Sequence, residues 1–153
     1  MNIYDYQRLV GKIDDISELR NRFITIYDIK SHQEMVQFCL ALGQHLLDMT
    51  GFKPYDEIPA SFRAMQRWLD GETNYHEARN LSFEISRLAR TEKDPIKAKF
   101  LRAMAQVAAS PHVKYHGLWA TDFAVALINK MHPGDLDEVR KERNKQIELL
   151  NAV

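Results

Sequence analysis

Apolar side chains recur every three or four positions along most of the chain, which is the spacing of helices that bury one face. The segment 74–90 shows this spacing most clearly. No two strand-like segments are joined by a hairpin turn, and strands do not alternate with helices. Only residues 23–27 are also good strand material, so a strand competes with a helix there. The pattern therefore predicts an all-α class: one domain over residues 1–153, a compact bundle of about six to seven helices.

The expected helices follow a short helix or arm over residues 3–12, and cover 15–27, 31–50, 59–70, 74–90, 94–109, 112–131 and 135–150. A Ser, Asp or Asn followed three residues later by Glu predicts a capping box, in which each side chain bonds a free backbone N–H. Such pairs are Asp15–Glu18, Ser31–Glu34, Asn74–Glu77 and Asp135–Glu138. Proline suits a first helical turn and glycine closes a last one, which assigns roles to Pro59, Pro95, Gly51 and Gly71.

Two of these helices carry specific expectations about burial. Residues 112–131 are apolar nearly all round, with only Thr121 and Asp122 interrupting the run between Leu118 and Leu127. A helix of this kind is usually central to its bundle, so we expect it to be the most buried element. In the last helix we expect a buried face of Leu136, Val139, Ile147 and Leu150, with the charges of 140–145 mostly facing solvent.

Composition and charge narrow the function classes. The chain has 153 residues, with 21 Lys plus Arg and 21 Asp plus Glu, so its formal net charge is zero. A nonspecific nucleic-acid binder would show a basic excess. No apolar run reaches the length of a membrane span and the first residues do not resemble a signal peptide, so we expect no membrane association. The single cysteine, Cys39, favours a reducing compartment, and we expect a packed Cys39 in a cytoplasmic protein.

The segment 112–116, His-Val-Lys-Tyr-His, is the sharpest candidate for chemistry. Two histidines four positions apart on a helix share one face and could both bind one metal ion. A catalytic zinc site needs a third protein ligand, for which the candidates are His45, His76, Glu84 and His132. The favoured interpretation is that His112 and His116 are structural, capping the break at Pro111 and bonding buried polar groups.

The segment 68–72, Trp-Leu-Asp-Gly-Glu, ends a helix on an aromatic anchor and an acidic turn. A packed Trp68 with a glycine stop is the plain interpretation, and an exposed interface patch is the functional one. Arg79, Arg87 and Arg90 share one helical face, where pairing with Glu84 and Asp70 is favoured over an anion clamp. No phosphate-binding glycine loop and no strained serine turn are present.

Several motifs together carry a family resemblance over roughly residues 36–150. They are the helix 39–48, the segment 67–72, the helix 77–90, the segment 105–117 with its two histidines, and Glu142-Arg143-Asn144-Lys145-Gln146. The chain resembles the bacterial Imm-5-like immunity proteins of polymorphic toxin systems. The resemblance implies a protein that binds and neutralises a cognate protein toxin. The family-motif positions are Trp68, Gly71, Glu72, Arg79, His112 and His116.

Two further hypotheses stay beside the immunity function. The first is a metal-dependent enzyme similar to the DinB-like helical bundles, with His45, His112 and His116 holding zinc or nickel. The second is a scaffold that only self-associates into a homo-oligomer. For a noncatalytic binding protein, which needs no cofactor, we expect the partner to contact the turn 68–72 and the loop 52–58, because connections often carry recognition. The residues expected there are Trp68, Asp70, Glu72, Phe52 and Tyr55.

Overall fold

The computed structural model describes residues 6–53 and 55–153, and within them it contains seven α-helices and no β-strand. The all-α prediction is therefore confirmed. The helices are α1 (Ser17–Ile29), α2 (His32–Thr50), α3 (Glu57–Leu69), α4 (His76–Thr91), α5 (Pro95–Ala109), α6 (Tyr115–Met131) and α7 (Leu136–Asn151). No helix in the described ranges is both long and apolar enough to cross a membrane.

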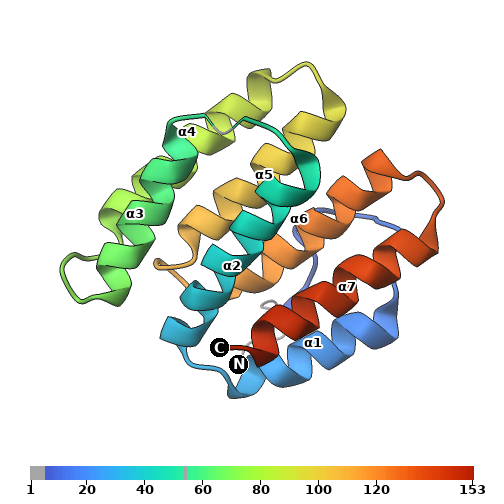
Figure 1. Ribbon diagram of the computed structural model, residues 1–153, viewed down its shortest axis with the longest axis horizontal. Helices are drawn as coiled ribbons and strands as arrows, with labels where there is room; N and C mark the ends of the chain where they lie inside the picture. Colours follow the sequence, from blue (N-terminus) through green and yellow to red (C-terminus); the bar gives the residue numbers. More distant parts are fainter. Residues whose placement is uncertain (1–5, 54) are drawn as a thin grey trace.

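The helices pack as a curved row with one helix laid across it (Figure 1). In the row, α3 packs on α4, α4 on α5, α5 on α6, α6 on α7, and α7 on α1. Helix α2 packs against α3, α5, α6 and α7, so it bridges the row from its front. One continuous core cluster includes side chains of every helix, among them Phe23, Phe38, Ile58, Ile85, Phe100, Leu118 and Leu150.

Helix α6 is the most buried element, as its apolar sequence predicts. Eleven of its 17 residues are buried, including every position from 120 to 128. Gly117 lies against α2, where an added Cβ would stand 2.6 Å from the Met35 Cε and 3.2 Å from the Cys39 Sγ. The close approach of α2 and α6 therefore depends on a small residue at this position. Cys39 is fully buried, as expected for a packed side chain.

Several predicted helix ends are correct. The Ser31 and Glu34 side chains form a complete capping box at the start of α2, and Gly51 closes that helix in the left-handed conformation. Asp94 accepts hydrogen bonds from the N–H groups of Ile96 and Lys97, and Asp135 does the same for the start of α7. These local signals work because they involve neighbouring backbone groups only.

Two predicted capping boxes are wrong. The N-cap residues of α1 and α4 are Ile16 and Tyr75, and neither cap uses a side-chain hydrogen bond. The Asp15 carboxylate pairs with Arg143, and Glu77 pairs with Arg67 and does not bond back to the cap. Before α4 only the Asn74 half of the box forms, where the Asn74 side-chain oxygen accepts from the His76 N–H at 3.0 Å. Two starts also differ from the prediction, since α3 begins at Glu57 and α6 begins at Tyr115.

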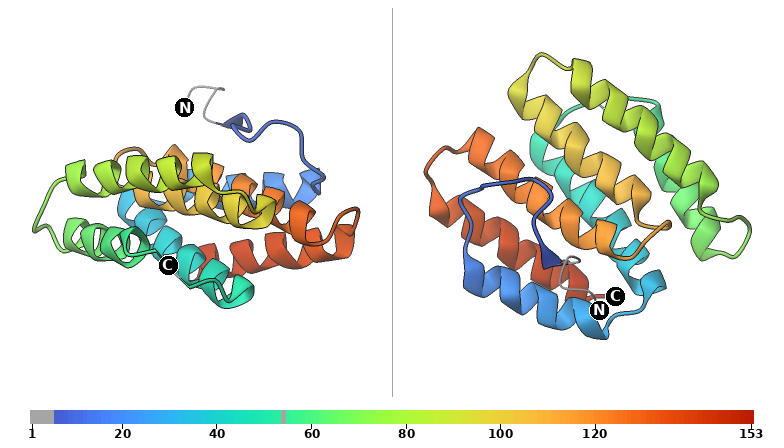
Figure 2. Two further views of the ribbon diagram at one scale, coloured as in Figure 1. Left: turned by 90° about the horizontal axis from the view of Figure 1, so that it is seen from above. Right: turned by 180° about the vertical axis from the view of Figure 1, so that it is seen from behind.

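Residues 6–16 form an arm that crosses the back of α6 (Figure 2). The Trp119 Nε1 donates to the Gln7 carbonyl at 3.0 Å. Further along, the Asn129 side chain bonds the backbone of Asp14 twice, once through each of its polar atoms. The arm is therefore fixed at both ends of α6. The part of the predicted segment 3–12 that precedes Tyr6 lies outside the described residues.

The prediction that residues 140–145 mostly face solvent is wrong for two of them. Glu142 is 3% exposed and Arg143 is fully buried, whereas Leu136, expected in the core, is 49% exposed. The reason is that α7 turns its Arg143 side into the junction with α1 and α6. There the Arg143 guanidinium pairs with the carboxylates of Asp15 and Asp122. Leu136 is the first residue of α7 and remains largely exposed.

The buried ion network consists of Asp15, Arg20, Asp122 and Arg143. Arg143 bonds both Asp15 oxygens, at 3.0 and 2.7 Å, and one Asp122 oxygen at 2.7 Å. Arg20 bonds both Asp122 oxygens, each at 2.9 Å. The remaining Arg143 N–H group donates to Thr121 and Gln146. Within the buried set two cations face two anions, and the partly exposed Arg8 also pairs with Asp15 at 2.9 Å. The network ties the arm, α1, α6 and α7 together.

Removing Arg143 would leave two carboxylates without their shared partner in a buried site. We expect Arg143→Met to lower the free energy of unfolding by about 3–5 kcal/mol, measured by urea denaturation at neutral pH. Arg140→Met is the matched control on the same helix, since Arg140 is exposed. Equal stabilities of the two variants would contradict the structural role of the network.

Candidate partner-binding surface

Side chains from four separate segments meet at one end of the bundle. The segments are the start of α2, the turn that joins α3 to α4, the start of α4, and the α5–α6 turn with the first turns of α6. We call the group the aromatic–histidine surface: His32, Trp68, Tyr75, His76, His112, Tyr115, His116 and Trp119. It gathers three of the predicted family-motif residues, Trp68, His112 and His116.

The rings contact one another in an almost continuous series. The His112 centroid lies 4.7 Å from Tyr75 and 6.0 Å from His116, and the His112 and His116 rings are stacked. The His116 ring meets the Trp119 ring edge-on at 5.4 Å. Tyr115 then contacts both His116 and Trp119. The series gives this end of the bundle a rigid ring-lined surface.

The α5–α6 turn is fixed by a local hydrogen bond and by a contact with α1. Ser110 ends α5 with its hydroxyl donating to the Val107 carbonyl, and Pro111 follows in a buried position. The Lys114 ammonium then donates to the Tyr27 carbonyl at 2.9 Å and lies over the Tyr27 ring. His112 therefore stands in a turn and not on α6, so the expectation of both histidines on one helix is wrong.

Hydrogen bonds fix the ring orientations of two histidines. The His32 Nε2 donates to the Ser110 carbonyl at 2.7 Å, and the His32 ring also packs on Trp68 at 4.8 Å. The His116 Nδ1 donates to the Gln106 side-chain oxygen at 2.7 Å. These contacts agree with the interpretation of His116 as a structural residue bonded to a polar group.

Two histidines of this surface, His112 and His116, favour their neutral form. Burial, together with the neighbouring His112, lowers the pKa of His116 to about 4. Burial also lowers the pKa of His112, and the charges of Arg79, His76 and His32 add to the effect. The surface is therefore uncharged at its centre near neutral pH.

The turn after α3 matches its plain interpretation. Trp68 is half-buried and packs on the core, and Gly71 takes a φ of 75° that suits glycine. Asp70 and Glu72 are exposed beside it. The Arg79 guanidinium lies 5.2 Å from the Phe83 centroid, so its contact is with a ring and not with the expected carboxylates.

The predicted contact residues of the loop 52–58 lie elsewhere. Phe52 packs on Phe100 at 5.3 Å, and the Tyr55 hydroxyl donates to Glu92 at 3.3 Å. This loop precedes α3 and the Trp68 turn follows it, so the helix separates them by about 20 Å. The structure does not bring the two predicted contact regions together.

The three histidines of the metal hypothesis also lie in different places. His45 donates to Glu142 of α7 at 2.7 Å, whereas His112 and His116 belong to the aromatic–histidine surface. Over residues 6–53 and 55–153, no three or more His, Cys, Asp or Glu side chains are placed to hold a metal ion. The described residues therefore give the DinB-like arrangement no support.

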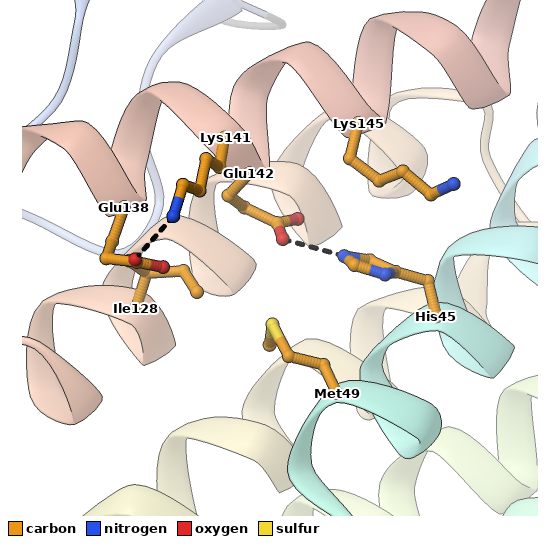
Figure 3. Close-up of a pocket in the computed structure, with 7 residues that line it drawn as sticks. All are labelled: His45, Met49, Ile128, Glu138, Lys141, Glu142 and Lys145. Carbon is orange, nitrogen blue, oxygen red and sulfur yellow. Dashed lines mark hydrogen bonds and ion pairs between the residues drawn. The ribbon is translucent and has the colours of Figure 1, made fainter.

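His45 lines a pocket of about 230 Å³ between α2 and α7 (Figure 3). The Glu142 carboxylate is held on both oxygens, by the His45 ring and by the Gln146 amide at 2.9 Å. The residues lining this pocket are His45, Met49, Ile128, Glu138, Lys141, Glu142 and Lys145. Among the described residues this lining has no Ser, Thr or Cys, so a base at His45 would have no hydroxyl or thiol group to activate there.

Comparison of the sequence with known families places the chain in a class of immunity proteins. A family model described as "Imm-5 like putative immunity protein" matches residues 25–153. The chain belongs to this family, and the resemblance carried by its motifs is confirmed. No curated protein and no solved structure matches the chain.

Part of the surface could not be identified from motifs. His32 and Tyr75 belong to none of the predicted motifs, and Tyr115 lies within the segment 112–116 without being predicted as a site residue. Their shared role follows from packing between segments that are distant in the sequence. The one local signal for this surface is the presence of aromatic residues at the end of α3, just before α4 and at the start of α6.

The neutral state of His116 has a measurable consequence for stability. The pKa of a histidine in an unfolded chain is about 6.5, whereas the pKa of His116 in the folded chain is about 4. Between these values the unfolded chain binds a proton that the folded chain excludes, so stability falls as the pH falls. We expect this residue to cost about 2–3 kcal/mol between neutral pH and pH 4.

His116→Gln should flatten the dependence of the unfolding free energy on pH over this range. Urea denaturation at a series of pH values measures it, with the exposed His76→Gln as the control. Superimposable pH profiles for the wild type and His116→Gln would show that the histidine is not held neutral by the fold.

Proposed function

We propose that this immunity protein neutralises a protein toxin by binding it, without catalysis, through the aromatic–histidine surface. One observation carries the proposal: the family-motif residue Trp68 is more than 40 positions from the motif pair His112 and His116, yet all three belong to this surface. Trp68 packs on His32, whose ring bonds the Ser110 carbonyl of the turn that holds His112. Motif residues that served only the core would have no reason to gather at one end of the bundle.

The chemistry of the surface suits protein recognition. Trp and Tyr are enriched where interfaces gain most of their binding energy. The rings are held by stacking and by bonds to Ser110 and Gln106, so little side-chain freedom remains to be lost on binding. Neutral histidines also cost less to remove from water than charged ones.

The exposed neighbours of the surface suit a polar rim. Asp70, Glu72 and His76 are exposed around the half-buried rings. Interfaces commonly combine such a rim with a central aromatic patch. We propose that these residues set the orientation of the partner while Tyr75 and His112 anchor it.

We also propose that the protein acts in the cytoplasm. Its only cysteine is buried, and burial raises the pKa of the Cys39 thiol to about 12. A chain that uses no disulfide suits a reducing compartment.

Co-expression with the toxin encoded by the neighbouring gene tests the proposed function. We expect the wild-type protein to restore growth, and Tyr75→Ala or His112→Ala to weaken binding by about 2 kcal/mol and to reduce protection. Binding of the purified pair by calorimetry gives the magnitude.

Leu136→Ala is the matched control, because Leu136 is an exposed apolar residue at the start of α7 and outside this surface. It should protect as well as the wild type. If cells die equally with and without the wild-type protein for every neighbouring toxin candidate, the immunity proposal fails. If Tyr75→Ala and His112→Ala protect fully, only the location of the interface fails.

A further inference from the structure

Five cationic side chains gather at the end of the bundle opposite the aromatic–histidine surface. We call them the basic surface: Lys12, Arg90, Lys99, Arg102 and Lys130. They line two adjoining pockets of about 290 and 470 Å³, and Lys99 and Lys130 belong to both pockets. The two pockets therefore adjoin each other at Lys99 and Lys130, and we call them together the hollow, which lies between the arm and helices α4, α5 and α6.

The position follows from the direction of the helices. Arg90 lies at the end of α4, Lys99 in the second turn of α5, and Lys130 at the end of α6. Tyr75, His112 and His116 stand at the other ends of the same three helices. At 1.5 Å per residue, these helices separate the two surfaces by about 20 Å.

The basic surface lacks acidic partners within the described residues. None of its five cations forms an ion pair or a side-chain hydrogen bond there, whereas Arg8, Arg20, Arg67 and Arg143 all pair with carboxylates. The chain has equal numbers of acidic and basic residues, so its carboxylates are placed elsewhere. A local excess of positive charge results.

This arrangement does not stabilise the fold. Lys99 is half-buried, and its burial together with the charges of Lys130 and Arg102 lowers the pKa of Lys99. Like charges held together raise the free energy of the folded state. A ligand with several negative charges would relieve that repulsion.

The residues that line the hollow indicate the chemical class of its ligand. Between the cations stand small or aliphatic side chains, namely Val10, Ile13, Ala89, Ala98 and Ala126. Among the described residues no aromatic side chain lines either pocket, so bases of a nucleic acid would find no ring there to stack on. Carboxylates could pair with the cations while aliphatic side chains cover the floor.

We propose that the basic surface is a second docking site, which binds a protein segment rich in Asp and Glu with interspersed aliphatic residues. The site is separate from the aromatic–histidine surface and does not rest on the neutralisation of a toxin. It also gives a chain of zero net charge an electrostatic means of attracting an acidic partner.

The test uses the full chain and a labelled peptide of about twelve residues in which two glutamates alternate with one leucine, followed by fluorescence anisotropy. We expect saturable binding that weakens about tenfold between about 50 and 300 mM NaCl. The Lys99→Gln/Lys130→Gln double variant should weaken it about tenfold more than the Arg63→Gln/Arg140→Gln double variant. Both variants lose the same charge, and Arg63 and Arg140 are exposed residues outside the basic surface.

Urea denaturation of both double variants separates binding from folding. Since Lys99→Gln/Lys130→Gln removes repulsion, its unfolding midpoint should not fall below that of the control variant. Absence of saturable binding to the wild type would overturn the proposal, as would equal weakening by the two double variants. Tighter binding of a single-stranded oligonucleotide of equal charge would replace the acidic segment with a nucleic acid and overturn it too.

Discussion

The ion pairs of the buried Arg143 hold together the half of the bundle that contains the arm, α1, α6 and α7. A guanidinium without solvent contact requires carboxylates at fixed positions, because an unpaired buried charge is strongly unfavourable. Asp15 of the arm and Asp122 of α6 meet this requirement, and Arg20 of α1 completes the balance. Burial opposes the ionisation of Asp15, yet the bonds and charge of Arg143 prevail and lower the pKa of that carboxyl group.

The positions of α6 and α7 determine which side chains lie at the two ends of the bundle and in the pocket beside α2. With α7 fixed by Arg143, the next residue toward its start, Glu142, faces α2 and meets His45 (Figure 3). With α6 fixed by Asp122, its first turn brings His116 to Gln106 and its last turn brings Lys130 beside Lys99. Both ends of α6 therefore carry a surface, one ring-lined and neutral, the other cationic.

Much of the fold could be predicted because its signals are local. The Ser31–Glu34 capping box, the Asp94 cap and the apolar run of α6 each depend on neighbouring residues. The buried ion network could not be predicted, because Arg143 and its partner Asp15 are 128 positions apart. In the sequence, Arg143 stands among charges typical of a solvent-facing helix. Asp122, a carboxylate inside an apolar run, was the one local signal.

The candidate site was predictable only in part. The motifs pointed to Trp68, His112 and His116, and the family resemblance gave the immunity function, which the match over residues 25–153 supports. The sequence did not reveal that Pro111 begins a turn lasting to Lys114, which takes His112 off the helix and stacks it on Tyr75. The contact between His112 and Tyr75 joins the ends of two different helices, so the spacing of residues along one helix could not predict it.

Hydrogen–deuterium exchange on the complex with the toxin of the neighbouring gene tests the central claim most directly. The account predicts slower exchange on binding in two peptides, one spanning residues 70–79 and the other residues 110–119, because these segments contain six of the eight residues of the aromatic–histidine surface. Slower exchange confined to peptides outside these segments, such as those lining the His45 pocket, would contradict it.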